Sequence, residues 1–324
     1  MRHRARALYL AILLGLFITG LAACDVDLGD VVVIEEGRGA LRTPTVPDVR
    51  REGSWYEIFF TDPSCPPFEQ RIGGLDAIIA TDLLQAESRV DIAAFDLDAV
   101  PIVEALIALR SRDVAVRVVT DDGYTEAGTT NRLRRNGLSV VEDGRSALMH
   151  NKFIVIDEQI VWTGSLNYTS NGAYCNNNNA VRFDVPELAA NYTAEMDEMY
   201  IARAFGPTSP AWMPHRQIRV NDVLIETYFG PEERIAPAIA AAVESAEEEI
   251  LFMMFSFTEE LIGEAMLGKA RQGVTVRGVF EATGSDTAFS YYERMLGERL
   301  PHLQVRKDGN PRLLHHKVLI VDRE

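Results

Sequence analysis

The chain has 324 residues, and 32 Lys and Arg against 48 Asp and Glu give it a formal net charge of −16. Hydrophobic residues make up 47% of the chain and charged residues 25%, a globular composition that excludes a mostly disordered protein. The excess of acid disfavours a protein that holds nucleic acid on a broad basic surface, and three cysteines are too few for a disulfide scaffold.

The first 23 residues have the pattern of a secretion signal. Three arginines precede an apolar stretch over residues 8–21, which is typical of a signal-peptide core and short for a membrane span. The stretch runs into Leu-Ala-Ala-Cys, which ends at Cys24 and resembles a bacterial lipobox. We therefore expect a signal peptide over residues 1–23 and lipidation of Cys24. This would give an exported protein, anchored by lipid to the periplasmic or extracellular face of the bacterial cell membrane; the alternative is an uncleaved N-terminal anchor.

Residues 24–53 are predicted to form a tether, because glycines, prolines and acids are scattered along them. Within this range only residues 31–34 have the composition of a strand. Export would place Cys65 and Cys175 in an oxidising compartment, where a disulfide between them is possible. The sequence does not give the distance between these two cysteines.

Two similar halves follow, over residues 54–204 and 221–324, with a proline-containing linker over residues 205–220 between them. Each half has an aromatic-rich strand, a helix, an apolar strand, a second helix and another apolar strand. The last of these strands, at 114–119 and 274–279, are closely similar. The alternation predicts an α/β fold with two pseudo-symmetric halves, each a mostly β-sheet core flanked by helices.

Each half contains the pattern His-x-Lys-x-x-x-x-Asp. The residues are His150, Lys152 and Asp157 in the first half and His315, Lys317 and Asp322 in the second. Each motif runs into an apolar, β-branched stretch that is predicted to be a buried strand. Because side chains two residues apart on a strand point to one face, the histidine and lysine of each motif project together. Two such pairs at matching places of a repeat favour a catalytic site over ordinary core histidines.

These motifs make residues 54–324 similar to the phospholipase D superfamily, which is defined by two HKD motifs. The first motif is followed by a Gly-Ser-x-Asn element of that family, which contains Ser165 and Asn167. The resemblance implies that these two residues bind the substrate phosphate. Residues 176–179 are four asparagines where many relatives carry Asn-x-Glu-Asn, so Asn178 stands in place of a glutamate.

The resemblance also implies a mechanism. The two motifs would form one site, in which one histidine attacks phosphorus and the other protonates the leaving alcohol and then activates water. The lysines would stabilise the phosphoryl oxygens, so neither a metal nor a cofactor is expected. Asp157 and Asp322 would orient the histidines. By resemblance His150 is the nucleophile and His315 the acid, although the sequence alone does not order them.

The second half is expected to be incomplete. Ser165 lies 15 residues after His150, and the same offset from His315 falls beyond Glu324. We therefore expect the chain to be a fragment of a longer protein, C-terminally truncated in its second half, or else a short natural variant.

The expected activity is that of a phospholipase D, which hydrolyses a phospholipid to phosphatidate and a free head group. A duplicated site on a lipid-anchored protein would act on the membrane beside it. The alternatives are phosphatidyl transfer, as in the cardiolipin synthases of the family, and an exported endonuclease that cleaves nucleic-acid phosphodiesters. A non-catalytic lipoprotein that binds anionic head groups or a partner is a further alternative from another functional class.

Overall fold

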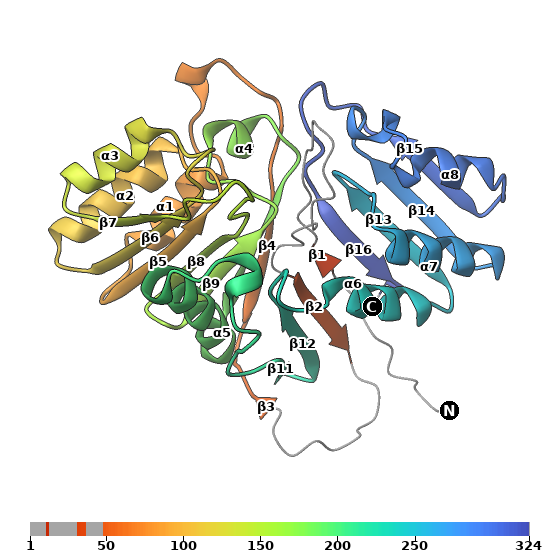
Figure 1. Ribbon diagram of the computed structural model, residues 1–324, viewed down its shortest axis with the longest axis horizontal. Coiled ribbons are helices and arrows are strands. Elements are labelled where there is room, and N and C mark those ends of the chain that lie inside the picture. The colour runs from red at the N-terminus through yellow and green to blue at the C-terminus, as the bar shows by residue number, and fades with distance from the viewer. Residues whose placement is uncertain (1–10, 13–30, 37–47, 324) are drawn as a thin grey trace. The chain divides into compact units, whose positions relative to one another are not determined.

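The computed structural model describes residues 11–12, 31–36 and 48–323, which fall into two compact units (Figure 1). The first unit is Glu52–His215. The second unit joins Arg216–Glu324 to the described residues of Met1–Arg51. Most of the expected signal peptide lies outside the described residues, and so does Cys24, the expected lipidation site.

The first unit is built on a seven-stranded sheet in the order β4-β10-β9-β8-β5-β6-β7. Its strands are Tyr56–Phe60 (β4), Arg89–Ala94 (β5), Ala115–Thr120 (β6), Ser139–Glu142 (β7), Lys152–Ile156 (β8), Ile160–Gly164 (β9) and Asn179–Asp184 (β10). Strands β5, β6 and β7 are parallel, and the remaining pairings are antiparallel.

Helices cover both faces of this sheet (Figure 1). They are Leu75–Leu83 (α1), Val100–Ser111 (α2), Ala127–Arg135 (α3), Ser170–Tyr174 (α4) and Pro186–Asp197 (α5), with single turns at Phe68–Gln70, Glu198–Ala202 and Gly206–Thr208. Ile154 packs in one core with α1 and α2, whereas the neighbouring Phe153 meets Tyr192 of α5, with ring centroids 5.0 Å apart. Because successive strand residues face opposite ways, α5 lies on the other side of the sheet. Burial on both faces explains why β5 and β8 are almost continuously apolar.

The second unit has a five-stranded sheet, β1-β16-β13-β14-β15, and a four-stranded sheet, β2-β12-β11-β3. The strands are Ala11–Ile12 (β1), Val31–Glu36 (β2), Asp48–Val49 (β3), Gln217–Val220 (β11), Val223–Tyr228 (β12), Glu249–Met254 (β13), Thr275–Phe280 (β14), Leu303–Lys307 (β15) and Lys317–Val321 (β16). The helices are Ile235–Glu244 (α6), Glu260–Arg271 (α7) and Tyr291–Gly297 (α8), with a 3-10 turn at Gly284–Asp286.

The larger sheet of the second unit repeats the pairing seen in the first. Strand β13 lies between the parallel β14 and the antiparallel β16, as β5 lies between β6 and β8. Helices α6 and α7 share a core with one face of this sheet. The other face carries a mostly apolar hollow of about 410 Å³, which Met253, Val279 and Ile320 help to line. In the first unit, α5 covers the corresponding face.

Two parts of the range that we expected to be a tether are strands. Strand β2 pairs antiparallel with β12, and β3 pairs parallel with β11. The β-branched residues of β2 favour a strand, and pairing satisfies the backbone groups along the edge of β12. Strand β1, within the range expected to be the signal peptide, pairs with β16. No helix among the described residues is long and apolar enough to span a membrane.

Candidate active site

The lysines of the two motifs occupy equivalent places in the two larger sheets. Lys152 opens β8 and pairs with Ala94, the last residue of β5. Lys317 opens β16 and pairs with Met254, the last residue of β13. Both lysines therefore lie at the carboxyl ends of parallel strands, where α/β proteins place their ligand sites.

In the first unit, a phenylalanine ring contacts both members of the His-Lys pair. Lys152 is only 2% exposed, and its Nζ donates a hydrogen bond to the carbonyl oxygen of His150 at 2.6 Å. The same Nζ lies 4.7 Å from the centre of the Phe95 ring, a cation–π distance. The His150 ring meets Phe95 edge-on, with centroids 4.5 Å apart. Phe95 thus packs against both side chains.

The second unit repeats this arrangement. Lys317 is 1% exposed, and its Nζ donates to the carbonyl oxygen of His315 at 2.9 Å. It lies 4.9 Å from the centre of the Phe255 ring, which meets the His315 ring at 4.8 Å. The sequence interpretation missed both phenylalanines as site residues. The feature that could have identified them is their common position, directly after the equivalent strands β5 and β13.

The motif aspartates do not orient the histidines, contrary to the expectation from the resemblance. In the first unit the carboxylate of Asp157 accepts hydrogen bonds of 2.8 Å from the backbone amides of Glu87, Ser88 and Arg89. These amides precede or open β5, at the end of the strand opposite to the lysine. The bonds lower the pKa of Asp157 despite an opposing contribution from burial, the largest single influence on it.

Asp322 does the same in the second unit. Its carboxylate accepts from the backbone amides of Glu247, Glu248 and Glu249 at 2.7–2.8 Å, at the start of β13. The physical reason is strand geometry: seven residues of extended chain span roughly 20 Å, so the two ends of the motif cannot meet. Asp157 and Asp322 are therefore structural aspartates that tie the helix–strand turn to the neighbouring strand.

A different acid supports the backbone next to His150. Asp121, at the end of β6, is 2% exposed, and its Oδ2 accepts a hydrogen bond of 2.9 Å from the amide of Met149. Its Oδ1 accepts from the amides of Gly123 and Tyr124. Burial raises the pKa of Asp121, and these amide donors oppose that rise.

Asp121 also belongs to a cluster of three acids. Among the described residues of the first unit, this is the one cluster whose oxygens lie close enough together to hold a metal ion. Oxygens of Asp121, Asp122 and Asp143 lie within 4.8 Å. Both oxygens of Asp121 already accept backbone amides, which fits a backbone anchor better than a metal ligand.

Of the two residues expected to bind phosphate, Ser165 is engaged within the fold. It is fully buried, its hydroxyl donates to Oδ1 of Asn178 at 2.9 Å, and it accepts from the amide of Asn179 at 3.0 Å. Asn178 in turn donates to the carbonyl oxygen of Gly172 in α4. The asparagine that stands in place of the family's glutamate thus joins Ser165 to α4. Asn167 is half-buried, and its Oδ1 accepts no hydrogen bond from the described residues. A phosphate-binding role for Ser165 and Asn167 stays a prediction.

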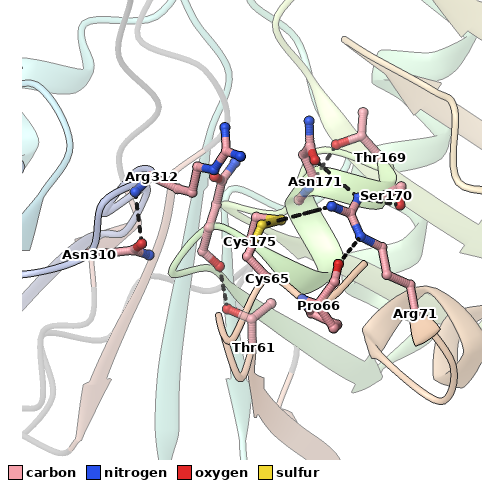
Figure 2. The surroundings of a disulfide bond; sticks show 12 residues. Thr61, Cys65, Pro66, Arg71, Thr169, Ser170, Asn171, Cys175, Asn310 and Arg312 are labelled. Atoms are coloured by element: carbon pink, nitrogen blue, oxygen red, sulfur yellow. Dashed lines mark hydrogen bonds between the residues drawn. A yellow bond between two sulfur atoms is a disulfide. The ribbon is translucent and has the colours of Figure 1, made fainter. Parts of the chain in front are cut away.

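A disulfide fastens this loop to the segment after β4. Cys65 and Cys175 are bonded, and the Arg71 guanidinium lies beside them, 3.3 Å from Sγ of Cys175 (Figure 2). Arg71 also donates to Oγ of Ser170 and to Oδ1 of Asn171 at the start of α4. The disulfide and this arginine hold α4 in place, directly after the Gly-Ser-x-Asn element.

The residues between the motif histidine and lysine differ in the two units. Asn151 is buried and donates to the carboxylate of Glu195 in α5 at 3.0 Å. His316, its counterpart, is buried as well, and burial together with the charge of Lys317 lowers the pKa of His316 to about 4. His316 is therefore neutral at physiological pH.

Comparison with known families identifies the fold. The family model described as "Cardiolipin synthase, PLD-like domain" matches residues 79–200 and 239–324, which together make up more than half of the chain. The chain belongs to the phospholipase D superfamily. Its similarity to two solved structures confirms the expected α/β fold. Phosphatidylserine synthase of Haemophilus influenzae aligns with a TM-score of 0.54 and 12% identity over 83% of this chain and 76% of that one. Polyphosphate kinase of Porphyromonas gingivalis aligns with a TM-score of 0.55 and 11% identity over 83% of this chain and 43% of that one.

Known proteins are similar in sequence as well. A mitochondrial cardiolipin hydrolase of Xenopus tropicalis is 31% identical over 137 residues, which cover 42% of this chain and 64% of the relative. A phospholipase D of Rickettsia conorii is 31% identical over 121 residues, 37% of this chain and 60% of the relative. The chain thus spans less than two thirds of the length of the curated relatives it matches.

Proposed function

We propose that the protein is a phospholipase D-type phosphodiesterase, which hydrolyses a phospholipid to phosphatidate and a free head group. The observation that carries the proposal is the repeated arrangement of histidine, buried lysine and phenylalanine at the carboxyl ends of β5 and β13. A buried ammonium group strongly favours an anion, and an imidazole beside it can act as nucleophile or as acid and base.

In the proposed reaction the two histidines serve one cycle. Nitrogen of His150 attacks phosphorus, the bond from phosphorus to the head-group oxygen breaks, and His315 gives a proton to that oxygen. His315 then takes a proton from water, which attacks phosphorus and breaks the phosphorus–nitrogen bond. Lys152 and Lys317 stabilise the charge that develops on the phosphoryl oxygens, so the reaction uses the chain's own cations rather than a metal or a cofactor.

The names of the relatives support a lipid substrate. They include cardiolipin hydrolases and a phospholipase D, and the family model carries the name of a cardiolipin synthase. That last name makes phosphatidyl transfer to a lipid alcohol the second candidate. The net charge of −16 weighs against the endonuclease alternative, because nucleic acid would be repelled by most of the chain.

The test is a single incubation of the full chain with mixed phospholipid vesicles and plasmid DNA in EDTA. Mass spectrometry follows the lipids, and a gel follows the plasmid. The His150→Ala variant is compared with His215→Ala, which removes a histidine that is remote in sequence from both motifs. Circular dichroism verifies that both variants are folded.

Phosphatidate that forms with the wild type and with His215→Ala, but not with His150→Ala, would support the proposal. Cardiolipin that forms with the wild type but not with His150→Ala would show phosphatidyl transfer instead of hydrolysis. Nicked plasmid with intact lipid would show that the protein is a nuclease instead of a lipid hydrolase. Histidine-dependent product that forms only in a parallel incubation without EDTA would contradict the metal-independent mechanism.

We further propose that the protein is exported and anchored through a lipidated Cys24. The basis is the amino-acid pattern over residues 1–24 alone. The test is metabolic labelling with a radioactive fatty acid in a bacterial host, for the wild type and for Cys24→Ser. Label in the wild type alone would support the anchor, and equal label in both would contradict it.

A further inference from the structure

Asn151, the residue between the histidine and the lysine of the first motif, connects that motif to Phe95. It is 8% exposed, and its backbone carbonyl oxygen accepts a hydrogen bond of 3.0 Å from the amide of Phe95. The Phe95 ring in turn contacts both His150 and Lys152. A displacement of the Asn151 backbone would therefore change how the Phe95 and His150 rings lie relative to each other.

The side chain of Asn151 is held by α5. Its Nδ2 donates to Oε1 of Glu195 at 3.0 Å and lies 3.7 Å from Sδ of Met199. Glu195 is 7% exposed. A hydrogen bond to a carboxylate is stronger than one between neutral groups, and burial removes the competition of water. Glu195 is thus an anchor for the residue that separates the motif histidine from the motif lysine.

Helix α5 is itself fastened to the sheet close to Glu195. Asp197, two residues further along, accepts a hydrogen bond of 2.5 Å from Arg117 of β6. Arg117 also donates to both oxygens of Asp91, a residue of β5 that is 1% exposed. Because these bonds tie the end of α5 to two central strands, Glu195 is a fixed acceptor for Asn151.

The second unit shares the backbone bond but has a different side chain. His316 takes the place of Asn151, and its carbonyl oxygen accepts from the amide of Phe255 at 2.8 Å. The backbone bond therefore belongs to the His-Lys-Phe arrangement itself, whereas the asparagine and the acid that holds it are found at the first motif. In the proposed reaction this is the motif of the nucleophile, whose attack on phosphorus is sensitive to its position.

We propose that Asn151 and Glu195 are positioning residues for the nucleophile His150. Glu195 fixes Asn151, Asn151 fixes Phe95, and these contacts hold the His150 ring in the orientation from which its nitrogen attacks phosphorus. The inference rests on the proposed phosphodiesterase activity. It deepens that activity, because it assigns the geometry of His150 to residues that the repeated motif does not specify.

The test removes the acceptor of the Asn151 side chain in one variant and keeps it in another. Glu195→Leu has an apolar side chain of similar size that accepts no hydrogen bond, whereas Glu195→Gln keeps an oxygen that can accept one. Asp82→Leu is the matched control, because Asp82 of α1 also accepts a side-chain hydrogen bond, of 2.6 Å from Nε1 of Trp162. Circular dichroism verifies that each variant is folded, and urea unfolding measures its stability.

Glu195→Leu should lower kcat about tenfold and leave KM within about twofold of the wild type, because the substrate still binds while the nucleophile is misplaced. Glu195→Gln should keep kcat within about threefold of the wild type. Asp82→Leu should lower the stability and leave kcat within about twofold. A wild-type kcat in Glu195→Leu, or an equal loss of kcat in Glu195→Leu and Glu195→Gln, would overturn the inference.

A second variant covers the case in which Glu195→Leu does not fold. Asn151→Leu/Glu195→Leu makes both partners apolar, so neither side chain leaves a buried polar group without a hydrogen bond. Its kcat should fall as far as that of Glu195→Leu, because the two residues act through one bond. A double variant with the wild-type kcat would overturn the inference.

Histidine NMR provides a readout that does not depend on turnover. The ring of His150 meets Phe95 edge-on, so the Phe95 ring affects the chemical shift of the proton on Cε1 of His150. That resonance is identified by its absence from the spectrum of His150→Ala. It should move in Glu195→Leu and stay close to its wild-type position in Glu195→Gln and Asp82→Leu. An unmoved resonance in Glu195→Leu would overturn the inference, whereas a wild type that hydrolyses no phosphodiester would contradict the proposed function.

Discussion

At the scale of single residues, the two aspartates of the repeated motif are bound to backbone amides. Asp157 accepts from three successive amides that lead into β5, and Asp322 accepts from three that lead into β13. Each aspartate thereby joins the start of one central strand to the end of its neighbour. This contribution is to stability rather than to the chemistry of the histidines.

Replacing these aspartates should lower the stability of the protein and leave its kcat almost unchanged. Asp157→Asn and Asp322→Asn keep one acceptor oxygen and lose the other, so each should lower the free energy of unfolding by about 1–2 kcal/mol. The kcat of the folded protein should stay within about twofold of the wild type, since neither carboxylate reaches a histidine. Urea unfolding and steady-state kinetics measure the two effects. A large loss of kcat at unchanged stability would contradict this prediction and would show that the aspartates act on the histidines.

His316 should make the protein sensitive to acid. Its pKa is lowered from 6.5 to about 4, so the unfolded chain binds a proton that the folded chain does not bind between these pH values. The free energy of unfolding should therefore fall as the pH drops from 6.5 towards 4. At pH 5 the loss from this one group is about 2 kcal/mol.

The variant that checks this is His316→Asn, which introduces the residue that the first unit carries at Asn151. The difference in unfolding free energy between pH 7.5 and pH 5 should shrink relative to the wild type. The same pH dependence in both proteins would show that His316 is not the group that titrates.

At the scale of elements, each larger sheet places its motif lysine at the carboxyl end of a buried central strand. The pairing of β8 with β5 puts Lys152 next to the segment of Phe95, and the pairing of β16 with β13 does the same for Lys317 and Phe255. In the first unit the disulfide then fastens α4 to the segment after β4 (Figure 2).

The double variant Cys65→Ser/Cys175→Ser should test that fastening. The bridge joins positions 110 residues apart, and removing a link across a loop of this size costs about 5 kcal/mol in the chain-entropy model. We expect a lower unfolding temperature and a fall in kcat, because α4 adjoins the Gly-Ser-x-Asn loop. Calorimetry and kinetics on the double variant, compared with reduced wild type, provide the measurement. Full stability in the variant would contradict the expectation.

At the scale of the whole molecule, two units with equivalent strand pairing carry one His-Lys-Phe arrangement each. If both arrangements serve one reaction, their histidines should behave as a single functional set. If they were two independent sites, each unit would retain its own activity.

Single and double histidine variants distinguish these cases. His150→Ala and His315→Ala should each lower kcat by about a thousandfold or more, and the double variant should be little worse than either, because groups that act together are strongly non-additive. His215→Ala should retain full activity. Single variants that each keep about half of the activity would show two independent sites. The readout is the initial rate of phosphatidate release at saturating lipid.

Features that depend on near neighbours along the chain can be predicted from the order of the residues. Alternating strands and helices predict the α/β fold, and the spacing of two residues predicts that His150 and Lys152 project together. Both do meet the Phe95 ring, although β8 begins only at Lys152. The contacts of those side chains depend on the folded chain. The amides that bind Asp157 lie about 70 residues away, and Asp121 reaches Met149 across 28 residues. Such partners depend on the pairing and register of strands, which the local spacing of residue types does not specify.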